Sequence, residues 1–260
     1  MLLTKEWMFM TIAIITGASA GLGQAFFAGI VRRYPSLEQI WLIARRAERL
    51  ETMAKDCPIP VEVFPLDLTA EASYEAFEAR LAAQKPAVQI LINNAGLGEL
   101  NEMIDSDRCT QTRMVDLNCR GLTAMATAVL PFMAKGGFII NIASIAAFAP
   151  TARMTVYSAT KAFDLHLSRG LREELRPRGV NVLAVCPGPM ATEFLAVADI
   201  TGRSATFDRL PYCDPQRVAD RALVKAAAGR GVYTPTAFFK FYRVVAKLLP
   251  TALVMKLCKT

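Results

Sequence analysis

The sequence predicts an α/β fold: a single domain built on a doubly wound parallel sheet, with helices on both faces. Two observations lead to this prediction. Short apolar runs alternate with helical stretches over most of the chain, which is typical of repeated β–α units. Most of these runs are apolar throughout, as expected for strands covered on both faces. A chain of 260 residues with 53% hydrophobic composition is long enough for one large domain.

The elements follow in order along the chain. The predicted strands are Thr11–Thr16, Ile40–Ala44, Val61–Leu66, Gln89–Asn93, Phe138–Ile142 and Val180–Val185. The predicted helices are Leu22–Tyr34, Arg46–Lys55, Ala70–Gln84, a long one near Thr112–Met133, and Thr155–Arg176. Right-handed crossovers between such units give a Rossmann-like sheet. Ligands of this architecture bind at the carboxyl ends of the strands.

The composition disfavours several classes of protein. The net charge is +7, but no cluster of Lys and Arg lies among aromatic residues, so we expect a mildly basic surface and no nucleic-acid partner. Six cysteines form no CxxC pair and only one histidine, His166, is present, so we expect no metal site. Scattered thiols are typical of a reducing compartment, and a cytoplasmic location is expected.

The start of the chain resembles a signal peptide, because Lys5 and an apolar run precede the small residues Ala18-Ser19-Ala20. The alternative is a buried strand that leads into a phosphate-binding loop. Cleavage after Ala20 would destroy that loop, and Glu6 is unusual before an apolar signal core. We therefore favour the strand.

A glycine-rich loop, TGASAGLG at Thr16–Gly23, lies between the first predicted strand and the first helix. Glycine allows a tight turn and a close approach to a pyrophosphate, and the helix N-terminus offers free N–H groups and a positive dipole end. The spacing is TGxxxGxG and not GxGxxG. This placement predicts a dinucleotide site.

The second predicted strand ends in Ala44-Arg45-Arg46, with no acidic residue. An acid at this position would accept a hydrogen bond from the ribose 2′-hydroxyl, whereas an arginine suits a 2′-phosphate. We therefore expect NADP(H) in preference to NAD(H). The alternative is that both arginines merely begin a solvated helix.

Tyr157 and Lys161 in the run YSATK have the i, i+4 spacing of one helix face, and Ser144 precedes Tyr157 by 13 residues. A free phenol titrates near 10, and a neighbouring ammonium lowers that value. Such a tyrosine can exchange a proton with a carbonyl or alcohol oxygen. A surface pair of side chains is the alternative. No GxSxG elbow accompanies His166, so a hydrolase is not indicated.

In these motifs the chain resembles the short-chain dehydrogenase/reductase (SDR) family from about Thr11 to Thr192. The matching segments are TGASAGLG, Asp67, Asn93-Asn94-Ala95-Gly96, the set of Ser144, Tyr157 and Lys161, and Pro187-Gly188 with Thr192. The resemblance implies the catalytic residues Asn118, Ser144, Tyr157 and Lys161. It implies the cofactor-binding residues Thr16, Gly17, Ser19, Gly21, Leu22, Gly23, Arg45, Arg46, Asp67, Leu68, Asn93, Ala95, Gly96, Tyr157, Lys161, Pro187, Gly188 and Thr192.

The resemblance also implies a role for each group. Tyr157 would be the general acid/base, Lys161 would lower its pKa and bind the nicotinamide ribose, and Ser144 would orient the substrate oxygen. Asn118 would hold a water of the proton relay, and Asp67 with Leu68 would flank the adenine. Some NADP-preferring members have a second basic residue in the glycine loop, but this chain has Ala20 there. The NADP preference therefore depends on Arg45 and Arg46.

Two segments would surround the substrate. Residues 190–211 lie where the family has its substrate lid, and apolar residues such as Phe194 and Leu195 suggest either a lipophilic pocket or packing on the domain. We place one domain at residues 1–230 and a basic amphipathic extension at residues 231–260. From Gly231 onwards the chain has five Lys/Arg and no acid. This extension is expected to pack on the fold, join subunits of a homodimer or homotetramer, or touch a membrane surface peripherally.

The sequence thus predicts an NADP-dependent oxidoreductase that transfers a hydride between the nicotinamide and a carbonyl or alcohol substrate, with a lipophilic substrate expected. The alternative is a non-catalytic NADP(H)-sensing protein with the same fold. Retention of both Tyr157 and Lys161 disfavours that alternative. A sugar-nucleotide epimerase is disfavoured by the chain length and the glycine spacing.

Overall fold

The structure, a computed structural model, describes residues 10–200, 202–204 and 208–257. Among these residues, seven parallel strands form one sheet in the order β3-β2-β1-β4-β5-β6-β7. The signal-like stretch before residue 10, residues 201 and 205–207 of the predicted lid, and Cys258 lie outside the described part. The strands are β1 (Thr11–Thr16), β2 (Gln39–Ile43), β3 (Val61–Phe64), β4 (Ala87–Asn93), β5 (Met133–Ile142), β6 (Asn181–Val185) and β7 (Val232–Tyr233).

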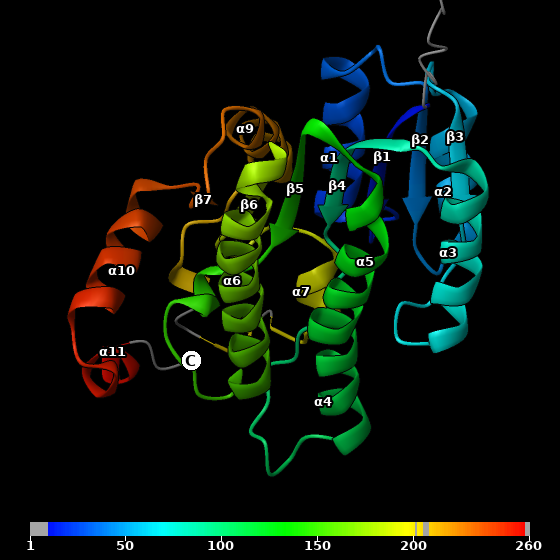
Figure 1. Cartoon of the computed structure of the whole chain (residues 1–260). Coiled ribbons are helices and arrows are strands. Elements are labelled where there is room, and N and C mark those ends of the chain that lie inside the picture. Colours follow the sequence, from blue (N-terminus) through cyan, green and yellow to red (C-terminus); the bar gives the residue numbers. More distant parts are fainter. Residues whose placement is uncertain (1–9, 201, 205–207, 258–260) are drawn as a thin grey trace, which may run out of the picture.

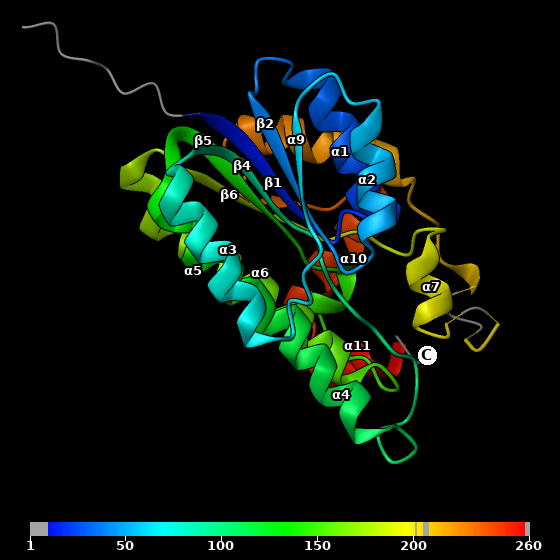
Figure 2. The same ribbon diagram turned by 90° about the vertical axis from the view of Figure 1, so that its right-hand side faces the viewer.

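Helices cover both faces of the sheet, as Figure 2 shows. One face carries α1 (Gly21–Arg33), α2 (Ala47–Lys55) and α9 (Pro215–Ala227); the other carries α3 (Glu71–Gln84), α5 (Leu122–Val129) and α6 (Thr155–Leu175). The helix α4 (Arg108–Val115) continues through the π-helical turn η1 (Asp116–Gly121) into α5. Shorter turns are η2 (Leu130–Phe132), η3 (Ile145–Ala147) and η4 (Arg176–Arg178). The prediction of a single-domain, doubly wound parallel sheet is confirmed.

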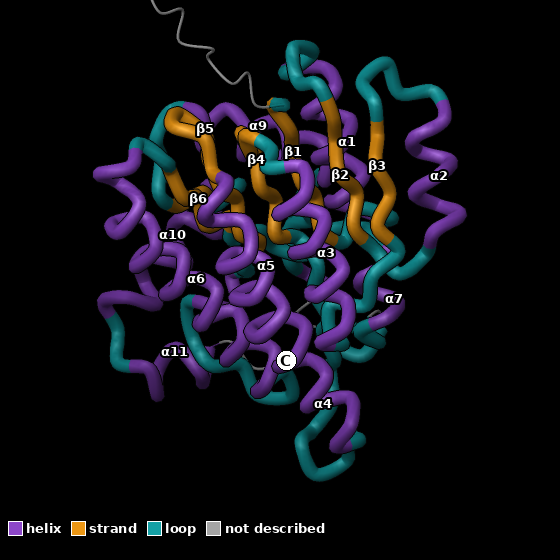
Figure 3. Tube along the Cα trace, turned by 45° about the vertical axis from the view of Figure 1, so that its right-hand side comes forward, coloured by secondary structure: helices purple, strands orange, loops and turns teal. Residues whose placement is uncertain are grey.

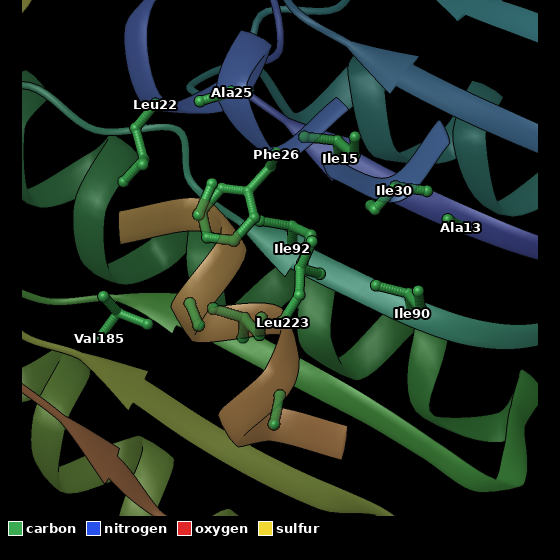
Figure 4. Close-up of a cluster of buried hydrophobic side chains, with 14 of the residues drawn as sticks. Ala13, Ile15, Leu22, Ala25, Phe26, Ile30, Ile90, Ile92, Val185 and Leu223 are labelled. Carbon is green, nitrogen blue, oxygen red and sulfur yellow. The ribbon is translucent and has the colours of Figure 1, made fainter. Parts of the chain in front are cut away.

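Strand residues alternate between two apolar layers. Figure 4 shows Ile15 and Ile92 of the sheet packed against Phe26 of α1 and Leu223 of α9. The intervening residues face the other layer, where Ile14 lies in one buried cluster with side chains of α3, α5 and α6. Burial of large side chains such as these contributes about 1.5–3 kcal/mol each. Because both faces are buried, the strands read as continuous apolar runs.

The strand order reverses between β1 and β4. The crossover after β1 leads outward to β2 and β3, and the chain then returns to pair β4 with the other side of β1. This reversal opens a crevice outside the carboxyl ends of β1 and β4, where ligands bind in such sheets. The glycine loop follows β1 and Asn93 ends β4, so both motifs lie at this crevice.

Three short helices lie beyond the carboxyl ends of the strands. They are α7 (Glu193–Val197), α10 (Ala237–Leu248) and α11 (Thr251–Leu257). In Figure 1 the strand arrows point downward toward the part of the molecule where these helices lie, and Figure 3 shows the same helices from another side. The end of the sheet that binds ligands is therefore covered by segments far apart in the sequence.

The structure differs from the prediction at the long middle helix, and it contains helix α9 and strand β7, which were not predicted. The long helix predicted near Thr112–Met133 is interrupted by η1 and ends in η2, and Met133 already belongs to β5. Pro131 explains this ending, because proline lacks the N–H that would continue the helix. Strand β7 was not predicted: it has only two residues, Val232 and Tyr233, and pairs with β6. The start of the predicted extension is thus a strand of the main sheet.

Candidate active site

A single continuous cleft of about 770 Å³ lies at the carboxyl ends of the strands. It is lined by the glycine loop, by the segments that follow β2 to β6, and by residues of α6, α7 and α10. A volume of this size falls within the range of small-molecule and cofactor sites. Most of the predicted site residues therefore meet in one place, although they come from segments spread over much of the chain.

The glycine loop is held in a shape that requires glycine. Gly17 and Gly21 have positive φ angles of 63° and 53°. A Cβ on Gly23 would lie 2.2 Å from the carbonyl oxygen of Gly17, so no other residue fits where α1 leaves the loop. Ser19 and Leu22 complete this part of the cleft wall together with Gly17 and Gly21. The loop leaves the N-terminus of α1 open to an anion.

Asn94 fixes this loop, and sequence reasoning gave it no role. Its Nδ2 donates to the carbonyl oxygens of Thr16 at 3.1 Å and Gly17 at 3.0 Å. The hydroxyl of Thr16 accepts from the backbone N–H groups of Asn94 and Ala95. Thr16 thus supports the loop from behind and does not itself line the cleft, while Ala95 and Gly96 do.

The residues Tyr157, Ser144 and Lys161 converge on the cleft from α6 and from the end of β5. The Ser144 hydroxyl lies near enough to the Tyr157 phenol to lower the pKa of that phenol. The Nζ of Lys161 lies 5.8 Å from the centre of the Tyr157 ring and donates to the carbonyl oxygen of Ile142 at 2.8 Å. A helix thus presents a phenol and an ammonium to the same space, beside a serine hydroxyl.

The net shift of the Tyr157 pKa is opposite to the one predicted from Lys161. Burial is the largest influence and raises the pKa of Tyr157, whereas Lys161 and Ser144 lower it. The net direction is upward, because the phenol is almost completely buried. The lowering predicted from Lys161 is present, but burial outweighs it. At neutral pH the hydroxyl therefore has its proton and can donate it.

Asn118 lies within the π-helical turn η1. Its side chain is fully engaged: Oδ1 accepts from Leu97 N–H at 2.8 Å, and Nδ2 donates to Leu97 O and to Thr160 Oγ1, both at 2.9 Å. It does not line the cleft, but its Oδ1 would lie 3.4 Å from a Cβ placed on Gly96. The π-turn, a feature frequent at functional sites, thus fixes Asn118 between the cleft loop and α6.

The far end of the cleft is charged. Arg45, Arg46, Asp67 and Leu68 line it, as the sequence predicted for residues after β2 and β3. Burial alone would raise the pKa of Asp67, but hydrogen bonds from Thr69 and the charges of Arg113 and Arg45 hold that pKa below its ordinary value. Asp67 is therefore ionised at neutral pH.

The Arg46 guanidinium is already engaged by protein groups. Its Nη2 donates to Ser19 Oγ at 3.2 Å, and its Nη1 donates to Glu193 of α7 at 2.9 Å. Arg49 binds the other oxygen of the same carboxylate at 2.5 Å. Glu193, which was not predicted as a site residue, thus connects the lid to the arginine pair across the mouth of the cleft.

The remaining predicted residues divide into two groups. Pro187, Gly188 and Thr192 line the cleft. Asn93 does not, because its side chain is buried and donates to Asn141 Oδ1 at 2.9 Å. A Cβ on Gly188 would lie 2.1 Å from the Phe239 ring, which shows that α10 packs directly on the Pro-Gly segment.

The half of the cleft near Tyr157 is apolar. Phe194 of α7 lies against the Tyr157 ring with 5.8 Å between centroids, and Leu195 shares a buried cluster with Tyr157 and Met154. From the tail, Phe238, Phe239 and Tyr242 line the same cleft. The apolar residues of the predicted lid therefore do both things considered from the sequence: they pack on the domain, and they form part of the pocket wall.

The protein has a doubly wound sheet with a phosphate loop, and its cleft has a buried Tyr–Lys pair at one end and charged residues at the other. These features together are typical of nucleotide-dependent oxidoreductases. The family model for short chain dehydrogenases matches residues 11–200. The chain belongs to the short-chain dehydrogenase/reductase family, and it is an oxidoreductase of that family.

Three relatives are informative. Serine 3-dehydrogenase of Agrobacterium fabrum is 37% identical over 71% of this chain and 74% of its own. A short-chain dehydrogenase from Sphingobium yanoikuyae, solved in complex with NADPH, is 33% identical, with a TM-score of 0.76 and coverage of 93% and 97%. The bulky-bulky ketone specific alcohol dehydrogenase from Comamonas testosteroni is 30% identical, with a TM-score of 0.73 and coverage of 93% and 95%. Two structures of the same fold, at 20% and 23% identity, hold NAD and NADH.

No group of three or more His, Cys, Asp or Glu side chains among the described residues is arranged to hold a metal ion. The described cysteines outside the tail are free thiols. Within the same part of the chain, none of the helices has both the length and the apolarity to cross a membrane.

Proposed function

We propose that this protein is an NADP(H)-dependent oxidoreductase of bulky, lipophilic carbonyl or hydroxyl compounds, with Tyr157 as general acid/base. The observation that carries this proposal is one cleft with two contrasting ends: two arginines at the far end, and a buried phenol among apolar side chains at the near end. In a cytoplasmic enzyme of this kind, NADPH would supply the hydride when bound. The carbonyl oxygen would take the Tyr157 proton, which solvent then replaces.

The lipophilic substrate class is supported by the wall around Tyr157. Ile145, Met154, Leu195 and Phe239 lie there, and among the described lining residues the charged groups other than Lys161 belong to the arginine end and its lid contact. A substrate carboxylate such as that of serine would find no second cation near Tyr157. The apolar lining thus suits a bulky ketone, as in the name of the alcohol dehydrogenase relative, better than it suits serine, as in the name of the serine dehydrogenase relative.

The test is NADPH oxidation by the purified protein against a series of carbonyls, from short aldehydes to long-chain and polycyclic ketones. We expect kcat/KM to increase with apolar size by about tenfold for each two buried methylene groups. Highest activity on serine-like or other charged substrates would contradict the substrate class. NADPH binding with no turnover on any carbonyl would favour the non-catalytic sensing protein.

The preference for NADP(H) is tested at the arginines. Arg45→Ala and Arg46→Ala are each expected to raise the Kd for NADPH about tenfold or more, because charge-assisted hydrogen bonds to the 2′-phosphate contribute about 1.5–3 kcal/mol. The Kd for NADH should change little. Arg49→Ala is the matched control, since Arg49 shares Glu193 with Arg46 but does not line the cleft. Equal losses of NADPH and NADH affinity would contradict the preference.

For the tail we propose contact with an anionic membrane surface. Phe241, Val244 and Leu248 of α10, here called the tail stripe, are 55–74% exposed, so packing within the fold does not account for them. Lys240, Arg243 and Lys247 lie on the same helix, and the chain after residue 230 has no acid. A two-fold contact between copies through this face would bring like charges together, whereas anionic lipid would complement them. A homodimer or homotetramer, which we also propose, would use another face.

Sedimentation with lipid vesicles tests the tail stripe. At low salt the wild type should bind vesicles that contain anionic lipid and not neutral ones, and Phe241→Ser with Leu248→Ser should abolish binding. Val224→Ser on α9, 48% exposed, is the control that should still bind. Equal sedimentation of wild type and tail-stripe variants would contradict the proposal, as would a change of oligomeric state in the variants without any vesicle binding by the wild type.

A further inference from the structure

A carboxylate is buried directly beside the catalytic lysine. Asp164 lies one helical turn after Lys161 on α6 and is 0% exposed. Its Oδ2 accepts from Lys161 Nζ at 2.9 Å. Buried carboxylates are rare and costly unless they are paired, so the proximity of this one to the reacting phenol needs a physical account.

Lys161 is the group that compensates this carboxylate. Among the described residues, Oδ1 of Asp164 accepts no hydrogen bond. The nearby Ser168 hydroxyl donates to the backbone oxygen of Asp164 at 2.6 Å and not to its side chain. The negative charge therefore acts mainly on the Lys161 ammonium, through surroundings of low polarity in which charges interact strongly.

The ion pair between Lys161 and Asp164 weakens the effect of Lys161 on the pKa of Tyr157. Burial opposes a charge on Lys161, but Asp164 and Tyr157 outweigh it and raise the pKa of the ammonium. Lys161 thus stays protonated, yet part of its positive field at Tyr157 is cancelled by Asp164. Burial is the main cause of the raised Tyr157 pKa, and the carboxylate acts in the same direction.

We propose that Asp164 is a positioning residue that acts through Lys161: it weakens the positive field of the ammonium at the Tyr157 hydroxyl, which favours the protonated phenol that reduction of a carbonyl requires. This inference rests on the proposed function and deepens it, because it assigns the favoured direction of proton transfer. In reduction Tyr157 has to start as the protonated acid, whereas in alcohol oxidation it has to start as the phenolate.

Two thiols near the pair do not titrate near neutral pH. Cys119 of η1 and Cys186 after β6 are thiols within electrostatic reach of Asp164; burial raises the pKa of the first to about 11 and of the second to about 12. Besides burial, Arg243 of α10 and Arg169 of α6 are the largest influences on the pKa of Cys186, and both lower it. Tyr157, Lys161 and Asp164 therefore determine the proton behaviour of this site between them.

The first test is the pH profile of kcat/KM for NADPH-dependent carbonyl reduction. Asp164→Asn preserves shape but removes the charge, so the high-pH limb should move down by about one pH unit. The activity of alcohol oxidation should extend to lower pH by a similar amount. Asp164→Glu, which restores the charge, should return the limb toward the wild-type position. Ser168→Ala alters the same turn of α6 without a charge change and should leave the limb in place.

A second measurement does not need turnover. Ultraviolet titration of the tyrosinate signal, taken as the difference between a protein and its Tyr157→Phe counterpart, reports Tyr157 alone. The Asp164→Asn background should titrate about one pH unit lower than the wild-type background. If the wild type reduces no carbonyl but this shift occurs, the proposed function fails and the inference about Asp164 stands. The inference would be overturned if Asp164→Asn lowered the melting temperature but left both the high-pH limb of the pH profile and the Tyr157 titration where they are in the wild type.

Discussion

Replacement of Tyr157 by phenylalanine is expected to lower kcat by about a thousandfold or more, since a positioned general acid contributes 10²–10⁴-fold to such a step. The phenol is buried, and its pKa is influenced by the neighbouring Ser144 and Lys161. The variant keeps the ring that packs on Phe194. The Kd for NADPH, measured by fluorescence titration, should therefore remain close to the wild-type value.

A matched control separates proton transfer from packing. Tyr242 also lines the cleft, but it comes from α10 and its ring lies beside Phe148, with 6.1 Å between centroids. Tyr242→Phe should change KM for large substrates and preserve the proton-transfer step. Turnover of Tyr157→Phe at the wild-type rate would eliminate the proposed mechanism.

Lys161→Met is expected to have the largest effect on stability. It removes the ammonium that compensates Asp164, and an unpaired buried charge destabilises a protein by about 3–5 kcal/mol. The free energy of unfolding, measured by urea titration at neutral pH, should fall by that amount. Turnover should be lost as well, since Lys161 lines the catalytic end of the cleft.

The double variant Lys161→Met with Asp164→Leu distinguishes the cause of this loss. Removal of both charges should restore most of the stability, since an apolar pair of similar volume replaces a buried ion pair at little cost. Activity should remain absent in the double variant. Additive destabilisation by the two substitutions would show that the buried pair is not coupled as the structure indicates.

The fold could be predicted because its signals are local. The central strands are continuous apolar runs, and the bounds of β1 agree with the predicted Thr11–Thr16. The glycine loop could be found from spacing alone, since glycine is the residue that most readily adopts the positive φ of Gly17 and Gly21. Strand β7 could not be predicted, because two residues give no periodicity and its pairing with β6 is a long-range contact.

The site was predictable where one residue type performs the chemistry, as for Tyr157 and Lys161. The roles of other residues could not be predicted, because they depend on burial or on contacts between segments far apart in the sequence. Asp164 shows the i, i+3 spacing of a helix pair with Lys161, but that spacing is common on exposed faces and does not indicate burial. The contact of Glu193 with Arg46 and Arg49 spans about 145 residues of sequence. The hold of Asn94 on the glycine loop is long-range in the same way.

The most direct test of the central claim is transfer of a deuterium label. NADPH deuterated at C4 of the nicotinamide would be incubated with the wild-type protein and a bulky ketone, and the alcohol product analysed by mass spectrometry and NMR. Our account predicts the label on the carbinol carbon of the wild-type product, and labelled product formed about a thousandfold more slowly with Tyr157→Phe. Alcohol formation by the wild type without the label, or labelled product at equal rates from both proteins, would contradict it.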